Sequence, residues 1–231
     1  MVRRALASVL FFALLAGVHF PASAQQVLVD DPTSVAPGAA QLEAWHSREE
    51  SWIAPAFRVH PRLELAAGTA FLRGAQANQR TVEYSLEGKV LLRPGSVHRI
   101  GAAVVSGIGA QELGLPRGRP ASTYAYGILS QTLVPDRLTA YQNLGWRHTD
   151  GGPHELTWGV RLDGSLFDRF ILIGEAYGEG HTTSLQAALR TVLLTNRIEA
   201  DVSITRSAIG ATPKTWGTVG FTFMSASLYS Q

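Results

Sequence analysis

The stretch Thr81–Leu92 reads TVEYSLEGKVLL and alternates between two kinds of side chain. Valine, tyrosine, leucine and glycine occupy its even-numbered positions, whereas Glu83, Ser85, Glu87 and Lys89 occupy odd-numbered ones. Successive side chains of a β-strand point to opposite faces. The stretch therefore predicts a strand with one apolar face and one charged face.

The same alternation recurs from residue 41 to the end of the chain, and no segment has the pattern of an amphipathic helix. We expect about twelve strands, with ten as the alternative count. An even number places both chain ends on the periplasmic side, as in bacterial barrels. The predicted strands are 41–49, 51–60, 62–72, 81–93, 97–108, 122–134, 138–148, 154–166, 169–177, 183–194, 198–208 and 215–229.

A short phrase marks about every second connection between these strands. It consists of a turn-forming residue, an arginine and then an apolar residue, and between its copies we expect longer, polar loops, at 178–182 among others. Alternating tight turns and longer loops are typical of an up-and-down transmembrane β-barrel. The copies are Pro61-Arg62-Leu63, Asp136-Arg137-Leu138, Asp168-Arg169-Phe170 and Asn196-Arg197-Ile198, with a looser one at His98-Arg99-Ile100.

Alternation alone does not separate a membrane barrel from a soluble sandwich, since both bury one face. The predicted strands are longer than the ~5–6 residues usual in soluble sheets, and aromatic residues lie near their ends. Aromatic rings favour membrane–water interfaces, so we interpret them as a girdle. They are Trp45, Trp52, Tyr124, Trp146, Trp158, Trp216 and Tyr229.

The chain begins with a signal peptide pattern at residues 1–24. Arg3 and Arg4 precede the uncharged run Ala5–Gly17, which is too short for the roughly 20 residues that span a bilayer, and an Ala-x-Ala cleavage site follows. We interpret residues 25–40, which are rich in turn formers, as an extended periplasmic segment that could act as a plug. Residues 41–231 then form the barrel.

Composition excludes several classes of protein. The formal net charge of +2 comes from the two arginines of the signal peptide, so the mature chain is neutral and gives no indication of nucleic-acid binding. The absence of cysteine excludes disulfides and cysteine-ligated metals.

The opening of the mature chain resembles outer-membrane proteins of the MetA-pathway-of-phenol-degradation type. The similarity is carried by Val29–Gly38 (VDDPTSVAPG), Gln41–Trp45 (QLEAW), Arg62–Leu65 (RLEL) and Asp136–Leu138 (DRL). The resemblance implies a twelve-stranded outer-membrane barrel, a transporter of small and often hydrophobic or aromatic compounds. It carries over no catalytic residues.

Strand parity predicts which charged side chains line the lumen. We expect Glu83, Glu87, Lys89, Glu155, Arg161 and Asp201 to do so. Two hypotheses stay open: these charges orient a passing solute, or they form a salt-bridge network that fills a narrow barrel. The wider inward set adds Glu43, Glu64, Arg99, Arg147, Asp163, Arg190 and Glu199.

Two other functions compete with a channel, namely lipid hydrolysis and the binding of an apolar ligand in a soluble barrel. A lipid hydrolase requires a nucleophile and a base in contact, and the chain shows no such signature, so we expect no catalytic residues. His148, Asp150 and His154 form only an unspecific metal pattern, and we expect neither metal nor cofactor. A soluble, lipocalin-like periplasmic barrel would turn the apolar faces inward around a ligand.

The sequence therefore predicts an all-β channel in the outer membrane of a Gram-negative cell, for passive passage of a small solute. Its expected partners are outer-membrane lipid and lipopolysaccharide, the solute and the barrel-assembly machinery. That machinery would recognise Tyr229 as a displaced C-terminal aromatic signal.

Overall fold

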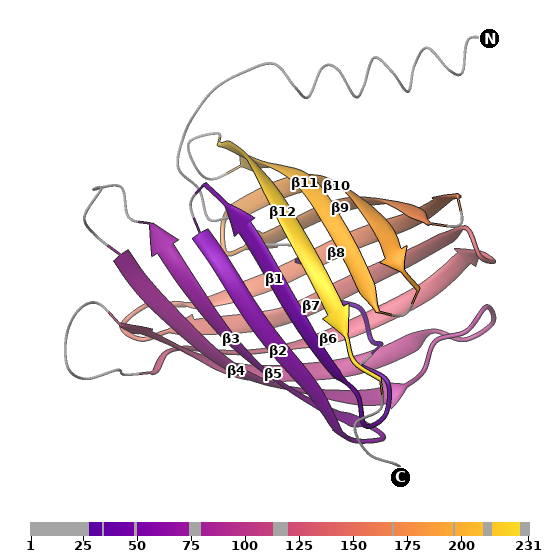
Figure 1. The fold of residues 1–231 in the computed structure, drawn as a ribbon. Coiled ribbons are helices and arrows are strands. Elements are labelled where there is room, and N and C mark those ends of the chain that lie inside the picture. Colours follow the sequence, from indigo (N-terminus) through magenta and orange to yellow (C-terminus); the bar gives the residue numbers. More distant parts are fainter. Residues whose placement is uncertain are drawn as a thin grey trace.

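The computed structural model describes residues 28–33, 35–48, 50–73, 80–112, 120–167, 169–195, 197–209 and 214–226. Twelve antiparallel strands pair in sequence order, and β1 closes on β12 to complete a barrel (Figure 1). The predicted fold class and the count of twelve are confirmed. The strands are β1 Ala40–Ser47, β2 Glu50–His60, β3 Leu63–Arg73, β4 Arg80–Arg93, β5 Gly101–Glu112, β6 Pro120–Val134, β7 Leu138–Thr149, β8 His154–Phe167, β9 Phe170–Glu179, β10 Thr182–Leu194, β11 Ile198–Ile209 and β12 Thr215–Met224.

The apolar faces of the strands point outward. Leu86, Leu144 and Leu156 are 60%, 63% and 59% exposed, whereas Lys89 and Arg161 on the opposite faces are 7% and 5% exposed. An apolar outer surface around a polar interior is the arrangement of an outer-membrane barrel. It is the reverse of what the lipocalin-like alternative requires, so that alternative is wrong.

Among the residues that the structure describes, no helix is long and apolar enough to cross a bilayer.

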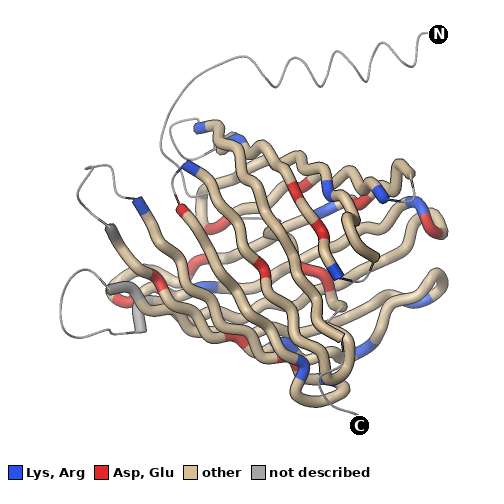
Figure 2. Tube along the Cα trace, viewed as in Figure 1, with Lys and Arg blue, Asp and Glu red and all other residues tan. Residues whose placement is uncertain are grey.

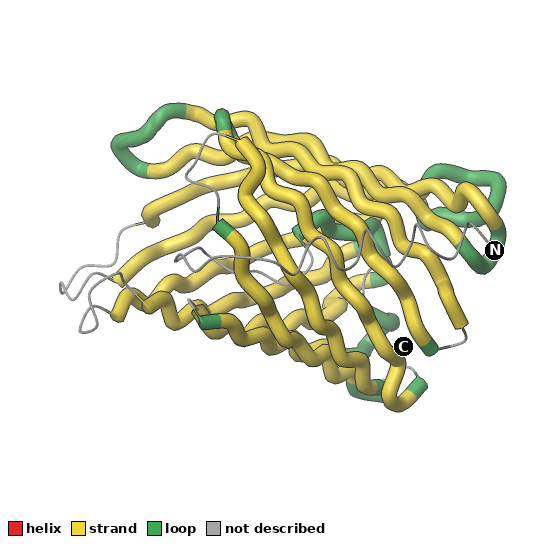
Figure 3. The backbone as a smooth tube through the Cα atoms, turned by 90° about the horizontal axis from the view of Figure 1, so that it is seen from above, coloured by secondary structure: helices red, strands yellow, loops and turns green. Residues whose placement is uncertain are grey.

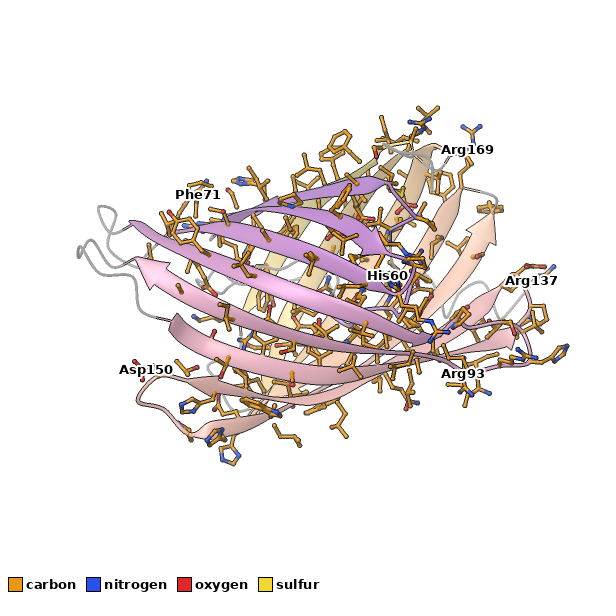
Figure 4. The ribbon with its side chains drawn as sticks, turned by 90° about the horizontal axis from the view of Figure 1, so that it is seen from below. His60, Phe71, Arg93, Arg137, Asp150 and Arg169 are labelled. Carbon is orange, nitrogen blue, oxygen red and sulfur yellow. The ribbon has the colours of Figure 1, made fainter. Side chains whose placement is uncertain are left out.

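The arginine phrase marks turns at one end of the barrel. Arg62 and Arg137 are exposed and lie between β2 and β3 and between β6 and β7, where Asp136 has a positive φ of 57°. Figure 4 shows Arg93, Arg137 and Arg169 at this end, with Asp150 toward the other. We refer to these as the turn end and the loop end. Asp168 and Asn196 lie outside the described residues.

Several predicted boundaries are wrong. The strand expected at 97–108 begins at Gly101, because Ser96 and Arg99 bond to each other through their backbones (3.0 and 3.1 Å) and hold the preceding residues in a turn. The expected loop at 178–182 is a tight turn between β9 and β10, where Gly180 has a φ of 56°. The last strand ends at Met224.

The segment before β1 runs inside the barrel, as the view in Figure 3 helps to follow. Val29 is only 1% exposed although it belongs to no strand, and Leu28 and Asp30 bond to side chains of several strands. We call Leu28–Thr33 the inner segment. The predicted signal peptide, residues 1–24, and Tyr229 lie outside the described residues.

Candidate functional site: the lumen and its inner segment

Two buried cations hold the inner segment. The Lys89 ammonium donates to the Asp30 carboxylate (3.0 Å) and to the Thr33 carbonyl oxygen (3.2 Å), and it lies 4.0 Å from Glu64. The Arg161 guanidinium donates from Nη1 to the Val29 carbonyl oxygen (3.1 Å). Removing either cation would leave buried acceptors unsatisfied, so these contacts fix the segment strongly.

Wall residues from other strands complete the attachment. The Leu28 N–H donates to Glu175 Oε2 (3.0 Å), and the Tyr126 hydroxyl lies 3.4 Å from the Asp30 carboxylate. With its amide oriented to satisfy both groups, Asn143 accepts from the Asp30 N–H (2.7 Å) and donates to its carbonyl (3.1 Å). The segment is therefore bonded to β6, β7 and β9 as well as to β4 and β8.

The chain just after the inner segment is bonded to β2 and β3. The Val35 N–H donates to Glu64 Oε2 (2.7 Å), and Arg58 Nη1 donates to the Val35 carbonyl oxygen (3.1 Å). These contacts from β2 and β3 lead the chain from the lumen toward the start of β1.

A glycine in the wall makes room for the segment. A Cβ atom on Gly159 of β8 would lie 2.5 Å from Val29 Cγ2 and 3.6 Å from Val29 Cβ. A larger residue at this position would require the Val29 side chain to shift. The barrel wall is thus shaped for the segment at its most buried side chain.

Cavities lie on both sides of the inner segment. Toward the loop end, Leu28 lines two of them, one of about 390 Å³ along β6–β10 and one of about 450 Å³ along β1–β6. Toward the turn end, Pro32 and Thr33 line a cavity of about 640 Å³, together with Arg62 and Tyr141. The segment therefore separates the space of the lumen into two vestibules.

The wall formed by β8–β11 carries paired charges. Arg161 binds Asp163 through two nitrogens (2.5 Å each) and lies 4.8 Å above the Tyr141 ring. Arg190 lies 2.7 Å from Asp201 and 3.6 Å from Glu199. Each of the two arginines is thus paired with at least one carboxylate, as buried charges must be.

The predicted site residues fall into two groups. Lys89 and Arg161 hold the inner segment, and Asp201, which is 3% exposed, pairs with Arg190. Glu83 and Glu87 line the 450 Å³ cavity, and Glu155 lies beside Gly180 at the loop end. Whether any of them acts on a solute stays a prediction.

Two sets of side chains were placed wrongly from sequence. Arg99 is exposed in the turn before β5 and does not face the lumen, because the strand begins later than expected. Trp45 and Trp52 are not part of an interfacial girdle: they line the cavity of β1–β6, together with Tyr124. Trp45 shares strand parity with Glu43, which was a usable signal in the sequence. Trp146, which is 44% exposed, does face outward.

The histidine cluster of the loop end has no metal site in the structure. The rings of His148 and His154 stack with centroids 4.4 Å apart, and Trp146 meets His154 edge-on. Across the described part of the chain, no group of three or more His, Cys, Asp or Glu side chains is placed to hold a metal ion.

A family model described as Uncharacterised conserved protein UCP029691 matches residues 10–224 of the chain. The chain belongs to this family. The specific likeness to the phenol-degradation type stays a prediction. No curated protein sequence matches the chain.

Solved structures share the fold at low identity. The KdgM porin in complex with disordered oligogalacturonate has a TM-score of 0.59 and 10% identity, over 80% of this chain and 98% of that chain. The COG4313 outer membrane channel from Pseudomonas putida F1 has a TM-score of 0.53 and 9% identity, over 87% of this chain and 100% of that chain. The chain thus has the fold of these outer-membrane barrels.

Proposed function

We propose that the protein is an outer-membrane channel for small solutes, narrowed by its own inner segment. The observation that carries this proposal is the position of Leu28–Thr33 across the lumen, with cavities on both sides of it. A twelve-stranded barrel encloses more space than the eight-stranded barrels that side chains nearly fill. The segment reduces that space without removing it.

The segment acts as a fixed constriction, and solutes pass beside it. Its attachment combines a buried ion pair at Asp30, a guanidinium contact at Val29 and backbone bonds to Glu175 and Asn143. Breaking all of these together would cost several times the ~1 kcal/mol of a single hydrogen bond. Displacement during each passage is therefore disfavoured.

The class of solute follows from the lining of the cavities. Passage of hydrophobic or aromatic compounds is the expectation from the family resemblance, and the aromatic rings of Trp45 and Trp52 favour an aromatic solute. The oligogalacturonate bound to the KdgM porin is a polyanion. An acid-rich cavity like the one along β1–β6 disfavours such a solute, so we do not extend that substrate to this protein.

Export of the protein and its insertion into the outer membrane require further partners. Residues 1–24 would be removed as a signal peptide, so that the mature chain begins at Gln25, three residues before the inner segment. The barrel-assembly machinery would insert the chain, and outer-membrane lipid and lipopolysaccharide would surround it. We do not propose an enzymatic activity, and a lipid hydrolase assay on phospholipid vesicles would test that choice.

Single-channel recording in planar bilayers tests the proposal. We expect the refolded mature protein to show small, discrete conductance steps, and a variant lacking residues 28–35 to show steps several-fold larger. Migration on unheated gels confirms that each protein is folded. A folded wild type without conductance would contradict the proposed channel, and unchanged steps in the folded deletion variant would contradict the constriction.

The single substitution Leu28→Trp covers the case in which the deletion variant does not fold. Leu28 lines both cavities at the loop end, so a larger side chain there should narrow the remaining path. We expect smaller conductance steps than in the wild type. Unchanged steps would place the conducting path elsewhere.

A further inference from the structure

The cavity along β1–β6 is created by small side chains. Ala54, Ala56, Ala66, Gly68 and Gly109 line it where other barrel positions carry larger residues. A Cβ on Gly68 would lie 2.4 Å from Ser85 Oγ and 3.0 Å from the Trp52 ring, so this glycine lets the indole lie against the wall. At about 450 Å³ the cavity falls within the ~300–1,000 Å³ range of small-molecule pockets.

The lining of this cavity is strongly acidic. Six carboxylates face two cations, although the mature chain as a whole is neutral. The two cations are already engaged: Lys89 pairs with Asp30 (3.0 Å), and Arg147 pairs with Glu179 (3.1 Å), which is not part of the lining. Figure 2 shows where the other cations are, mostly near the ends of the barrel. The carboxylates of the lining are Asp30, Glu43, Glu50, Glu64, Glu83 and Glu87.

Two of these carboxylates are bonded only to neutral donors. Glu43 accepts from Gln41 Nε2 (2.6 Å), and Glu87 accepts from the Tyr124 hydroxyl (3.0 Å). Among the described residues, neither has a lysine, arginine or histidine nitrogen within 4.0 Å. A partly buried carboxylate is stabilised by a cation. Glu43 and Glu87 are therefore available to pair with a cation that enters the cavity.

Aromatic faces accompany the carboxylates. Trp45 and Trp52 stack with centroids 5.6 Å apart and an interplanar angle of 17°. Trp45 is 8% exposed, and its indole Nε1 has no hydrogen-bond partner in the described structure. Tyr124 already holds the Arg147 guanidinium 5.6 Å above its ring. Aromatic faces beside carboxylates are the chemistry that recognises quaternary ammonium groups and other organic cations.

We propose that the cavity lined by Trp45, Trp52, Glu43 and Glu87 is a binding site for a small organic cation. The cation would carry a methylated or protonated amine toward the carboxylates and an apolar part toward the indoles. The site lies on the loop-end side of the inner segment, where a solute arriving from outside would meet it first. This inference deepens the proposed channel function and rests on it for its biological role.

Calorimetric titration of the refolded mature protein in a nonionic detergent tests the site without requiring conduction. The probe is benzyltrimethylammonium, and benzoate serves as the anion of similar size. We expect saturable binding of the cation and none of benzoate. Absence of saturable cation binding, or equal binding of benzoate, would overturn the inference.

Variants locate the binding within the lumen. We expect Glu43→Gln and Glu87→Gln combined to weaken binding of the cation about tenfold or more, the equivalent of ~1.4 kcal/mol or more. Glutamine keeps the size and hydrogen-bonding capacity of glutamate, so the change is in charge. Glu155→Gln removes the same charge from β8, outside this cavity, and should leave the affinity unchanged. Equal weakening by Glu155→Gln would contradict the assignment.

Trp52→Leu separates recognition of the organic group from recognition of charge. We expect it to weaken benzyltrimethylammonium binding while leaving the K⁺ over Cl⁻ preference of the channel unchanged. A loss of ion preference in Trp52→Leu would indicate a general change of the lumen and would contradict the aromatic contribution. A barrel that conducts but does not bind the probe rejects only this inference, whereas one that binds it without conducting rejects the channel function.

Discussion

The two walls of the lumen use the same residue types with opposite results. On β8–β11, Arg161 pairs with Asp163 and Arg190 pairs with Asp201. On β1–β6, small residues leave a cavity of about 450 Å³, in which Glu43 and Glu87 are bonded to neutral donors. Lumen charges can therefore hold the barrel together or offer a site to a solute, and pairing decides between the two roles.

Breaking an ion pair on the β8–β11 wall should cause the largest loss of stability. Arg190→Ala removes the cation 2.7 Å from Asp201, which is 3% exposed. Losing one partner of a buried pair costs ~3–5 kcal/mol. We expect a loss of this size in the free energy of unfolding, measured by urea titration in lipid vesicles. A loss below ~1 kcal/mol, the usual value of exposed pairs, would show that this wall is not held by its charges.

A larger side chain where the wall contacts the inner segment should cause an intermediate loss of stability. In Gly159→Ala the new Cβ would lie 2.5 Å from Val29 Cγ2, and overpacking typically costs ~1–3 kcal/mol. We expect a lower unfolding midpoint and altered conductance steps, because the segment has to move. Gly174→Ala on β9 is the matched control, since nothing lies within 4 Å of its Cβ. Equal effects of the two substitutions would place the segment elsewhere.

Removing charge from the β1–β6 wall should have the smallest effect on stability. Glu43→Gln changes no ion pair of the described residues, so we expect a change within about 0.5 kcal/mol in the free energy of unfolding. The reversal potential in a KCl gradient should nevertheless shift toward lower cation preference. A large loss of stability with no shift would show that Glu43 is structural, like the acids of the other wall.

Much of the barrel could be predicted from sequence because its signal is local. The alternation in Thr81–Leu92 requires only neighbouring residues, and the structure has β4 there. The start of β5 was misplaced because Val97 and Ile100 are residue types favoured in strands, and the backbone bonds between Ser96 and Arg99 leave no mark in residue type.

The contents of the lumen could not be predicted in the same way. The contact between Arg161 and Val29 spans 132 residues and ends on a backbone carbonyl oxygen, which every residue has. The cavity depends on Gly68 and Gly109 lying near Trp52 and Glu83 across strands, which requires the register of β2–β6. The parity of Trp45 with Glu43 would have predicted an inward direction. The position of Trp45 near a strand end favoured the interfacial interpretation instead.

A reversible crosslink between the inner segment and the wall tests whether the segment stays in place while solutes pass. The chain has no cysteine, and the separation of 3.6 Å between Val29 Cβ and a Cβ built on Gly159 matches the ~3.5–4.5 Å of disulfides. Single-channel conductance of the variant carrying Val29→Cys and Gly159→Cys would be recorded oxidised and after reduction. We predict equal conductance in the two states, because solutes pass beside a segment that stays in place. A channel that is closed when oxidised and opens on reduction would contradict the account and make the segment a gate.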